Sequence, residues 1–377
     1  MKTESKKLFT GIATLTGTII GAGFLGIPYV VAKSGFLVGL LHMIVISLVM
    51  LTVNLMIGEI TLATSAVHQL PGYASKYLGR KTKLIIFLAS IFGLYAALIA
   101  YLIGEGESLS FIFSGTGNYS LLAGAVFWLV VAFISIRGIK RFKKIEPLGV
   151  FAVFVVTLIF GIISFNKINI ENLKYIDYKF LFYPFGVVLF SFLGTSAVPE
   201  MRRVLMKNEK LMKKAIVIGS LVPLLVYTLF VIVVLGLYGQ NVFEIATISL
   251  GRVVALLGIF TMFTAFLALN LALQDTYRFD FELKSKTAWF LSTFLPLIVF
   301  ILVKIFSLAG FVKILSLGGT ISGGAMGIAM ILIHEKLKSL RLRRQMERKP
   351  EFRINIHPVI KVLIAILFIV GVVYEFL

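Results

Sequence analysis

Two carboxylates lie inside an apolar stretch of the chain, where a charge is costly. Glu105 and Glu107 belong to AYLIGEGESL at 100–109, and an ionisable residue inside a membrane helix usually faces water, a partner or a transport path. Side chains two positions apart on a helix point about 200° away from each other, so these two cannot share a face. We expect one of them, Glu105 before Glu107, to carry a proton or to gate a vestibule. The alternative is a pair of exposed carboxylates at the outer end of a helix.

Glycine, proline and small polar residues interrupt two other apolar runs. The interruptions are GTIIGAGFLGIP at 17–28 and SFLGTSAVPE at 191–200. Glycine and proline free backbone groups from helical hydrogen bonds, and in lipid such groups are tolerated only where they face protein or a watery cavity. Two broken helices that cross the membrane in opposite directions indicate a transport site. The alternative is close packing of helices through small residues.

The elements that must position these groups are membrane helices. Of the 377 residues, 59% are hydrophobic, 14% are charged and none is cysteine, whereas soluble domains carry about a quarter charged residues. This composition excludes a disordered chain, a disulfide scaffold and a thiolate metal site. Runs of about 20 apolar residues predict membrane spans. The eleven predicted spans are 8–32, 36–60, 84–114, 119–136, 147–165, 181–205, 213–236, 252–274, 287–303, 310–333 and 358–376.

The basic residues assign an orientation to these spans. The net charge of +20 arises from 37 Lys and Arg against 17 Asp and Glu. With a cytoplasmic N-terminus, 30 of the 37 fall on the inner side, as the positive-inside rule requires. We therefore expect a multi-pass protein of the plasma membrane that binds lipid and no nucleic acid, with its C-terminus outside. The basic run at 340–353 could also contact anionic lipid.

No set of catalytic residues is visible in the sequence. Paired buried aspartates, a HExxH pair and a GxxxxGK[ST] loop are all missing, so we expect neither an enzyme nor an ATP-driven pump. Glu59, Glu200 and Asp275 fall near cytoplasmic span ends, and we interpret them as plain interfacial charges in preference to inner-gate ion pairs.

Several stretches of the chain resemble one transporter superfamily. GTIIGAGFLGIPYVVAKSGF at 17–36 resembles the first-span signature of the amino acid/polyamine/organocation (APC) superfamily. It is closest to the aromatic and hydroxy amino acid permease branch and the related amino acid/auxin permeases. GEITLAT at 58–64, AYLIGEGESL at 100–109, KKAIVIGSLVPLLVYTLF at 213–230 and TAFLALNLALQDTYRF at 264–279 are similar to later parts of the same family.

The resemblance implies a leucine-transporter (LeuT) fold, an all-α polytopic membrane protein of 11 transmembrane helices. Its 5+5 inverted repeat would cover about 8–165 and 181–333, with discontinuous helices 1 and 6. An extra helix at about 358–376 would complete a single membrane domain, 1–377. The implied function is secondary active uptake of an amino acid by alternating access, coupled to protons or sodium. A sensor or a passive channel built on the same fold is the alternative, and the sequence leaves the oligomeric state open.

The resemblance also implies where the substrate binds. The substrate carboxylate would bind backbone amides of the first break, and the ammonium would bind carbonyls of both breaks. On the third span we prefer Tyr101 to Tyr95 as a lining residue. An uncharged lining of Phe, Leu and Gly favours a neutral or aromatic substrate. The expected substrate-binding residues are Gly17, Thr18, Ala22, Gly23, Tyr101, Phe190, Ser191, Leu193, Gly194 and Thr195.

The coupling ion is the remaining expectation, and no other cofactor is expected. Sodium would take carbonyls of Gly17 and Ile20 and the hydroxyl of Thr264, but the adjacent Ala265 offers no second hydroxyl. Some proton-coupled relatives place a lysine in the fifth span, and 147–165 has none. We favour protons, with Glu105 and Glu107 as the candidate carriers.

Overall fold

A computed structural model describes all residues except 1, 137–154, 156–157 and 160. The described residues form helices joined by loops, with one isolated β-bridge between Gly35 and Ile176. The first half contains α1 (Lys2–Ile19), η1 (Ala22–Gly26), α2 (Ile27–Ser34), α3 (Phe36–Ala63), α4 (Leu70–Leu78), α5 (Arg80–Ser114), α6 (Ser120–Ile136), η3 (Phe165–Lys167), α8 (Glu171–Lys174) and η4 (Tyr178–Phe180). The second half contains α9 (Phe185–Ser191), α10 (Ala197–Val204), η5 (Glu209–Leu211), α11 (Met212–Tyr238), α12 (Ala246–Ser249), α13 (Arg252–Asp280), α14 (Ser285–Ile305), α15 (Phe311–Gly318), the π-helical turn η6 (Gly319–Gly323), α16 (Gly324–Leu342) and α17 (Pro358–Phe376).

The helices confirm the all-α membrane class but not the count of eleven spans. Among the described residues, seven helical segments are long and apolar enough to cross a membrane, or eight if the pair bent by 48° around the first break is one span. The predicted span 119–136 corresponds to the shorter helix α6, and 181–205 is divided into α9 and α10. The predicted span 147–165 lies largely outside the described residues. The eleven-span inverted repeat therefore stays a prediction.

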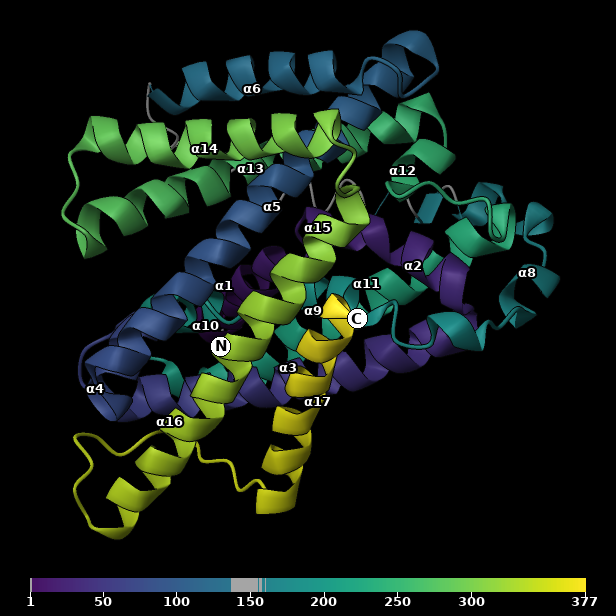
Figure 1. Cartoon of the computed structure of the whole chain (residues 1–377). Coiled ribbons are helices and arrows are strands. Elements are labelled where there is room, and N and C mark those ends of the chain that lie inside the picture. The colour runs from purple at the N-terminus through teal and green to yellow at the C-terminus, as the bar shows by residue number, and fades with distance from the viewer. Residues whose placement is uncertain (1, 137–154, 156–157, 160) are drawn as a thin grey trace.

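The helices pack in two groups with the broken segments between them. In one group α5, α6, α13 and α14 contact one another, and in the other α1 and α3 each contact α10 and α11. Figure 1 shows α6, α13 and α14 as one layer, with α5 crossing from it toward α4. The short pieces η1, α9 and α15 contact one another, and α5 contacts α15 while α13 contacts η1. Both breaks thus lie where the two groups meet.

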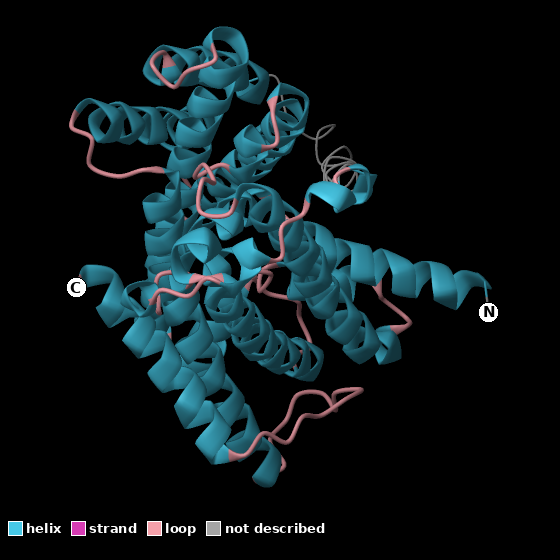
Figure 2. Cartoon of the chain, turned by 90° about the vertical axis from the view of Figure 1, so that its right-hand side faces the viewer, coloured by secondary structure: helices cyan, strands magenta, loops and turns pink. Residues whose placement is uncertain are grey.

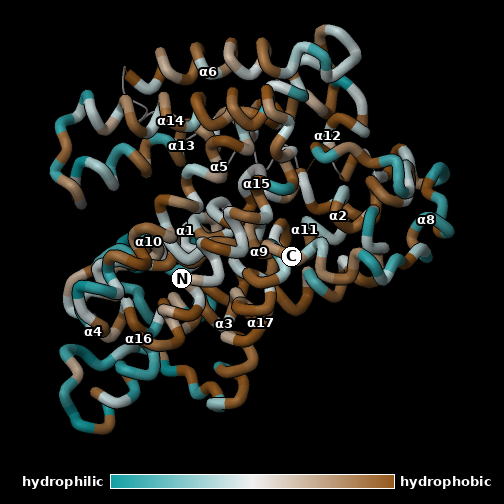
Figure 3. The backbone as a smooth tube through the Cα atoms, in the orientation of Figure 1, coloured by the Kyte–Doolittle hydropathy of each residue, from teal (hydrophilic) through white to brown (hydrophobic). Residues whose placement is uncertain are grey.

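The surface of the bundle is apolar along the helices and polar at the loops. Figure 3 shows hydrophobic residues along the long helices, whereas polar residues gather around α8 and in the loop after α16. Exposed apolar side chains follow α17, for example Val359, Leu363 and Val373, each more than half exposed. An extended apolar surface of this kind marks an interaction site. On a helix long enough to cross a membrane, such a surface is suited to contact with lipid chains. Figure 2 shows the N-terminal end of α1 projecting beyond the bundle.

Candidate functional site

The first break separates α1 from α2 by a change of backbone geometry. Helix α1 ends at Ile19, Gly21 is extended at φ −88° and ψ −158°, and a 3₁₀ turn then runs from Ala22 to Gly26. Pro28 lies in the first turn of α2, where its missing N–H costs no helical hydrogen bond. The first N–H groups of a helical segment have no acceptor in a preceding turn. Ala22 and Gly23 therefore hold the position from which backbone donors can reach a ligand.

The second break separates α9 from α10 by five residues, 192–196. Helix α9 ends at Ser191, and α10 begins at Ala197 with Pro199 in its first turn. The chain closes into tight turns here, since Leu193 N–H donates to Phe190 O at 3.1 Å and Ala197 N–H donates to Gly194 O at 3.1 Å. The backbone thus leaves the helical path within the segment 191–200, where the sequence is interrupted.

The two breaks lie directly against each other. A Cβ added to Gly23 would lie 2.7 Å from Cδ1 of Phe190 and 3.1 Å from Oγ of Ser191. A Cβ added to Gly194 would lie 2.5 Å from Cγ1 of Ile19. A side chain at either position would therefore have to displace side chains of the opposite break. The structure brings Gly23, Phe190, Ser191 and Gly194 together although they come from opposite ends of the first 200 residues.

Tyr227 of α11 joins the two breaks and was not among the residues expected from the sequence. Its hydroxyl lies 2.9 Å from Ile19 O and 3.0 Å from Ser191 O, so its single proton is shared between these two carbonyls. Both carbonyls are at helix ends, which leave C=O groups without an intrahelical donor. The ring is fully buried and packs against Phe24 and Phe192, at centroid distances of 5.8 and 5.1 Å. A tyrosine inside an apolar helix usually forms a hydrogen bond when it is buried. This general rule is the one feature of the sequence that could have drawn attention to Tyr227.

The two tyrosines of α5 have different surroundings. Tyr101 is buried, and its hydroxyl would lie 3.7 Å from a Cβ added to Gly21, so it faces the first break. Tyr95 instead lies 2.8 Å from the hydroxyl of Tyr277 and donates to Leu291 O at 3.2 Å, in the group formed by α13 and α14. Of the two, Tyr101 lies by the break.

The remaining expected substrate residues lie around the contact between the breaks. The Phe190 ring lies between Gly23 and the start of the π-helical turn, because a Cβ on Gly318 would be 3.4 Å from Cε2 of Phe190. Leu193 contacts Gly323, and the Thr195 hydroxyl lies 3.9 Å from Sδ of Met326. These two side chains therefore face α16 and its π-helical turn.

The candidate sodium ligands come from α1 and α13. No atom lies within 4 Å of a Cβ built on Gly17, and Thr18 donates to Thr14 O at 2.9 Å. The buried Thr264 hydroxyl lies 3.1 Å from both Phe260 O and Thr261 O, so its proton is used within its own helix and its lone pairs stay available. Such an oxygen is the kind of ligand that sodium needs, and the site at Gly17, Ile20 and Thr264 stays a prediction.

The two carboxylates of α5 occupy opposite environments. Glu105 is fully buried, and neither of its oxygens has a hydrogen-bond partner among the described residues. Glu107 pairs with Lys304 at the end of α14, with 3.1 Å between Oε1 and Nζ, and both side chains are about a quarter exposed. Glu105 and Glu107 therefore cannot have the same role. Glu107 already has a counterion, Lys304, whereas a proton is the simplest partner for an isolated buried carboxylate such as Glu105.

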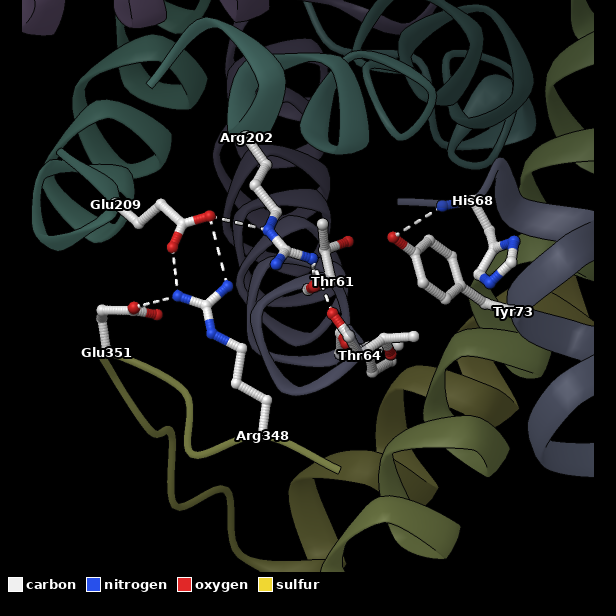
Figure 4. Close-up of polar contacts among 9 residues, drawn as sticks. Thr61, Thr64, His68, Tyr73, Arg202, Glu209, Arg348 and Glu351 are labelled. Carbon is white, nitrogen blue, oxygen red and sulfur yellow. Dashed lines mark hydrogen bonds and ion pairs between the residues drawn. The ribbon is translucent and has the colours of Figure 1, made fainter. Parts of the chain in front are cut away.

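Ion pairs close the end of the molecule where α3 and α10 terminate (Figure 4). Arg202 of α10 pairs with Glu209 at 2.8 Å and donates to the carbonyls of Thr61 and Thr64 at the end of α3. Arg348, in the loop between α16 and α17, also pairs with Glu209. One carboxylate thus holds two arginines from segments far apart in the sequence. Arg202 is buried, so these bonds form away from bulk water.

Glu59 extends this closure and corrects an expectation. It is fully buried, pairs with Arg341, accepts from His334 Nε2 at 3.1 Å and accepts from Ile354 N–H at 2.9 Å. The interpretation of Glu59 as a plain interfacial charge is therefore wrong. Glu200 is exposed, as that interpretation requires.

A third ion pair joins the loop between α16 and α17 to α4. Glu347 pairs with Lys76 at 2.5 Å and accepts from Ser65 N–H at 3.1 Å. The hydrogen bond from the Lys76 ammonium, followed by that from Ser65, holds the pKa of Glu347 below its ordinary value. This link therefore stays charged over a wider range of acidity than a free glutamate would.

Comparison with known proteins places the chain among membrane transporters. A model of the tryptophan/tyrosine permease family matches residues 4–376. Glutamine transporter 2 of Aliivibrio fischeri is 26% identical over 312 residues, covering 78% of this chain and 80% of the relative. The tryptophan-specific transport protein of Haemophilus influenzae is 25% identical over 334 residues, covering 78% and 79%. Tyrosine-specific transport system 1 of the same organism is 26% identical over 335 residues, covering 81% and 82%.

Proposed function

The chain belongs to the tryptophan/tyrosine permease family, a family of membrane transporters and not of enzymes, and we propose that it takes up a neutral, preferably aromatic, amino acid across the plasma membrane. Transport would follow alternating access in an APC-type, LeuT-like fold, an eleven-span inverted repeat with a cytoplasmic N-terminus. The observation that carries the proposal is the contact of the two breaks, with Gly23 against Phe190 and Ser191 and with Tyr227 bonded to both helix ends.

The chemistry around the breaks suits a zwitterion with an apolar side chain. Neither 8–32 nor 181–199 contains a charged residue, so the carboxylate would bind the N–H groups at Ala22 and Gly23, at the positive end of a helical segment. The ammonium would bind carbonyls at the ends of α1 and α9. The rings of Phe190 and Tyr101 lie beside this position and would contact an aromatic substrate. Relatives named for tryptophan, tyrosine and glutamine fit the same neutral class.

Contacts between segments agree with the proposed division of the loops between the two sides of the membrane. Each of the following polar contacts joins two segments that the charge distribution assigns to the same side of the membrane. At the proposed cytoplasmic side they are Glu59 with Arg341, Arg202 with Glu209 and Lys76 with Glu347. At the proposed outer side they are Glu107 with Lys304, Lys313 with Glu375 and Gly35 with Ile176.

Proton coupling is the mechanism that Glu105 supports. An ionised carboxylate without partners is among the most costly groups to bury in a membrane protein, and both oxygens of Glu105 lack partners in the part of the chain that the structure describes. Uptake of a proton would allow the closed state to form, and exposure to the cytoplasm would release it. The sodium site at Gly17, Ile20 and Thr264 is the competing scheme.

Uptake into proteoliposomes tests the function directly. We expect labelled tryptophan or tyrosine to accumulate above its external concentration when the outside is acidic, with or without sodium. Accumulation that requires sodium at every pH would replace the proton scheme by the sodium scheme. Binding without accumulation, measured as a thermal shift of the purified protein with each of the twenty amino acids, would instead indicate a sensor or a channel. No thermal shift and no uptake with any amino acid would refute the proposal.

A further inference from the structure

A cavity of about 330 Å³ lies beside the ion pairs of Glu59, between the last turns of α16, the first turn of α17 and the segment that joins them. Figure 1 shows α16 and α17 side by side, connected by the long loop at the bottom of the view. Five basic side chains line the cavity. They are His334, Lys338, Arg341, Arg353 and Lys361. The cavity is separate from the proposed substrate site and from the proposed coupling-ion sites.

The positive charge around the cavity exceeds the negative charge. Arg341 pairs with Glu59, and Lys361 pairs with Glu335 at 2.5 Å. The other two cations that line the cavity have no acidic partner within 4 Å in the described part of the chain. These two are Lys338 and Arg353. Four cations therefore face two carboxylates, and like charges held at one cavity without an anion repel each other.

Buried groups hold this cluster in place. Lys361 and His334 are both more than nine-tenths buried, and the Lys361 ammonium donates to His334 Nδ1 at 2.8 Å. His334 must then carry its proton on Nε2, where it donates to Glu59, so the imidazole is neutral and fixes the orientation of both neighbours. Nε of Arg341 is also buried, and the guanidinium is held by its pair with Glu59.

We propose that this cavity binds a phosphate group carried by an anionic ligand. Three of the basic residues, His334, Lys338 and Arg341, follow the spacing i, i+4, i+7, which places them on one face of α16. Guanidinium and ammonium groups both bind phosphate oxygens through charge-assisted hydrogen bonds, and two of each line this cavity. Basic pockets between membrane helices at the cytoplasmic side suit lipid headgroups, and a soluble phosphate offers the same oxygens.

The surroundings indicate where the rest of a lipid would lie. Val359, Ile360 and Leu363 are each about half exposed or more, on the first turns of α17 next to Lys361. Acyl chains of a lipid whose headgroup occupies the cavity could pack along this surface. A soluble phosphate would leave it uncovered, so an experiment can separate the two sources.

Thermal unfolding of the full-length protein, washed free of lipid in a neutral detergent, tests the site. The probes are a short-chain phosphatidylglycerol, a phosphatidylcholine of equal chain length and inorganic phosphate at constant ionic strength. A rise of several degrees in Tm with phosphatidylglycerol alone identifies a lipid site, and a rise with phosphate identifies a soluble ligand. Equal effects of both lipids, or no effect of any probe, would overturn the proposal.

Variants locate the effect in the cavity. Lys338→Gln and Arg353→Gln each remove a charge without breaking an ion pair, and each should weaken the apparent affinity about tenfold or more, the value of one charged hydrogen bond. Lys338→Arg should retain binding, as should Lys349→Gln, which alters an exposed lysine of the same loop that does not line the cavity. An unchanged affinity in both neutral variants would place the anion elsewhere and contradict the proposal. These measurements need no transport, so they are independent of the proposed function.

Discussion

The centre of this protein and the end at which α3 and α10 terminate are held together in different ways. At the centre, close packing and an uncharged hydroxyl hold the segments: Gly23 lies against the Phe190 side chain, and the hydroxyl of Tyr227 bonds two helix ends. At the end, charged side chains hold the segments: Glu59 pairs with Arg341 in the last turn of α16, and Glu209 pairs with Arg348 of the loop that follows. If the proposed substrate binds at the centre, polar backbone must stay available there, and a side-chain charge would compete with it. Under the proposed alternating access the end would open and close, and ion pairs can exchange their partners for water.

The largest effect on stability should come from removing a charge at the closed end. Glu59→Gln leaves Arg341 without its counterion, and breaking a buried ion pair costs about 3 to 5 kcal/mol. Arg341 is about a quarter exposed, so the low end of that range applies, and Tm should fall by several degrees. Glu200→Gln, which alters an exposed glutamate, is the matched control. Equal Tm values for the two variants would mean that the Glu59 network does not stabilise this state.

At the centre, a single methyl group should affect transport more than stability. Gly23→Ala puts a Cβ 2.7 Å from the Phe190 ring, and overpacking of this kind costs about 1 to 3 kcal/mol. The added methyl also fills the place where the substrate would bind, so uptake in proteoliposomes should fall about tenfold or more. Gly117→Ala is the control, because nothing lies within 4 Å of a Cβ at that loop position. Normal uptake by Gly23→Ala would show that this contact is not part of the substrate path.

The hydroxyl that joins the breaks should have an intermediate effect. Tyr227→Phe keeps the ring contacts with Phe24 and Phe192 but leaves two buried carbonyls without this donor, at a cost of about 1 to 3 kcal/mol. Tyr95→Phe removes a comparable hydroxyl within the other helix group. We expect both variants to lower Tm, and only Tyr227→Phe to raise the substrate concentration needed for half-maximal uptake. If Tyr227→Phe had the same uptake kinetics as the unmodified protein, the Tyr227 hydroxyl would contribute to stability alone.

The sequence could predict features that depend on a local pattern, but not those that depend on residues far apart in the chain. The breaks were visible because glycine, proline and small polar residues interrupt apolar runs, a local pattern. Tyr227 and Glu59 were missed or misread because their partners lie far along the chain, 208 residues away for Ile19 and 282 for Arg341. A charge near a span end has the same local sequence whether it faces water or a buried arginine. The split of 181–205 into α9 and α10 follows from the same interruption that indicated the site.

Glu105→Gln should change the pH profile of uptake with little loss of stability. The amide is close in size to the carboxyl group and cannot be ionised, so the variant resembles the protonated state at every pH. If Glu105 carries the coupled proton, accumulation driven by a pH gradient should disappear while exchange of internal for external substrate remains. Counterflow measured beside gradient-driven uptake distinguishes these activities. Loss of both would indicate damage to the substrate path instead of the proton path.

The smallest effect should come from Glu107, although it lies only two residues from Glu105. Its pair with Lys304 is about a quarter exposed on each side, and such surface pairs contribute about 0 to 1 kcal/mol, less at high salt. Glu107→Gln should therefore shift Tm by about a degree or less and leave the pH profile of uptake unchanged. A double-mutant cycle with Lys304→Gln, in low and high salt, measures the pair directly. A coupling energy well above about 1 kcal/mol, or a pH profile altered as in Glu105→Gln, would mean that the outer pair takes part in gating, and the division of roles between the two carboxylates would have to be abandoned.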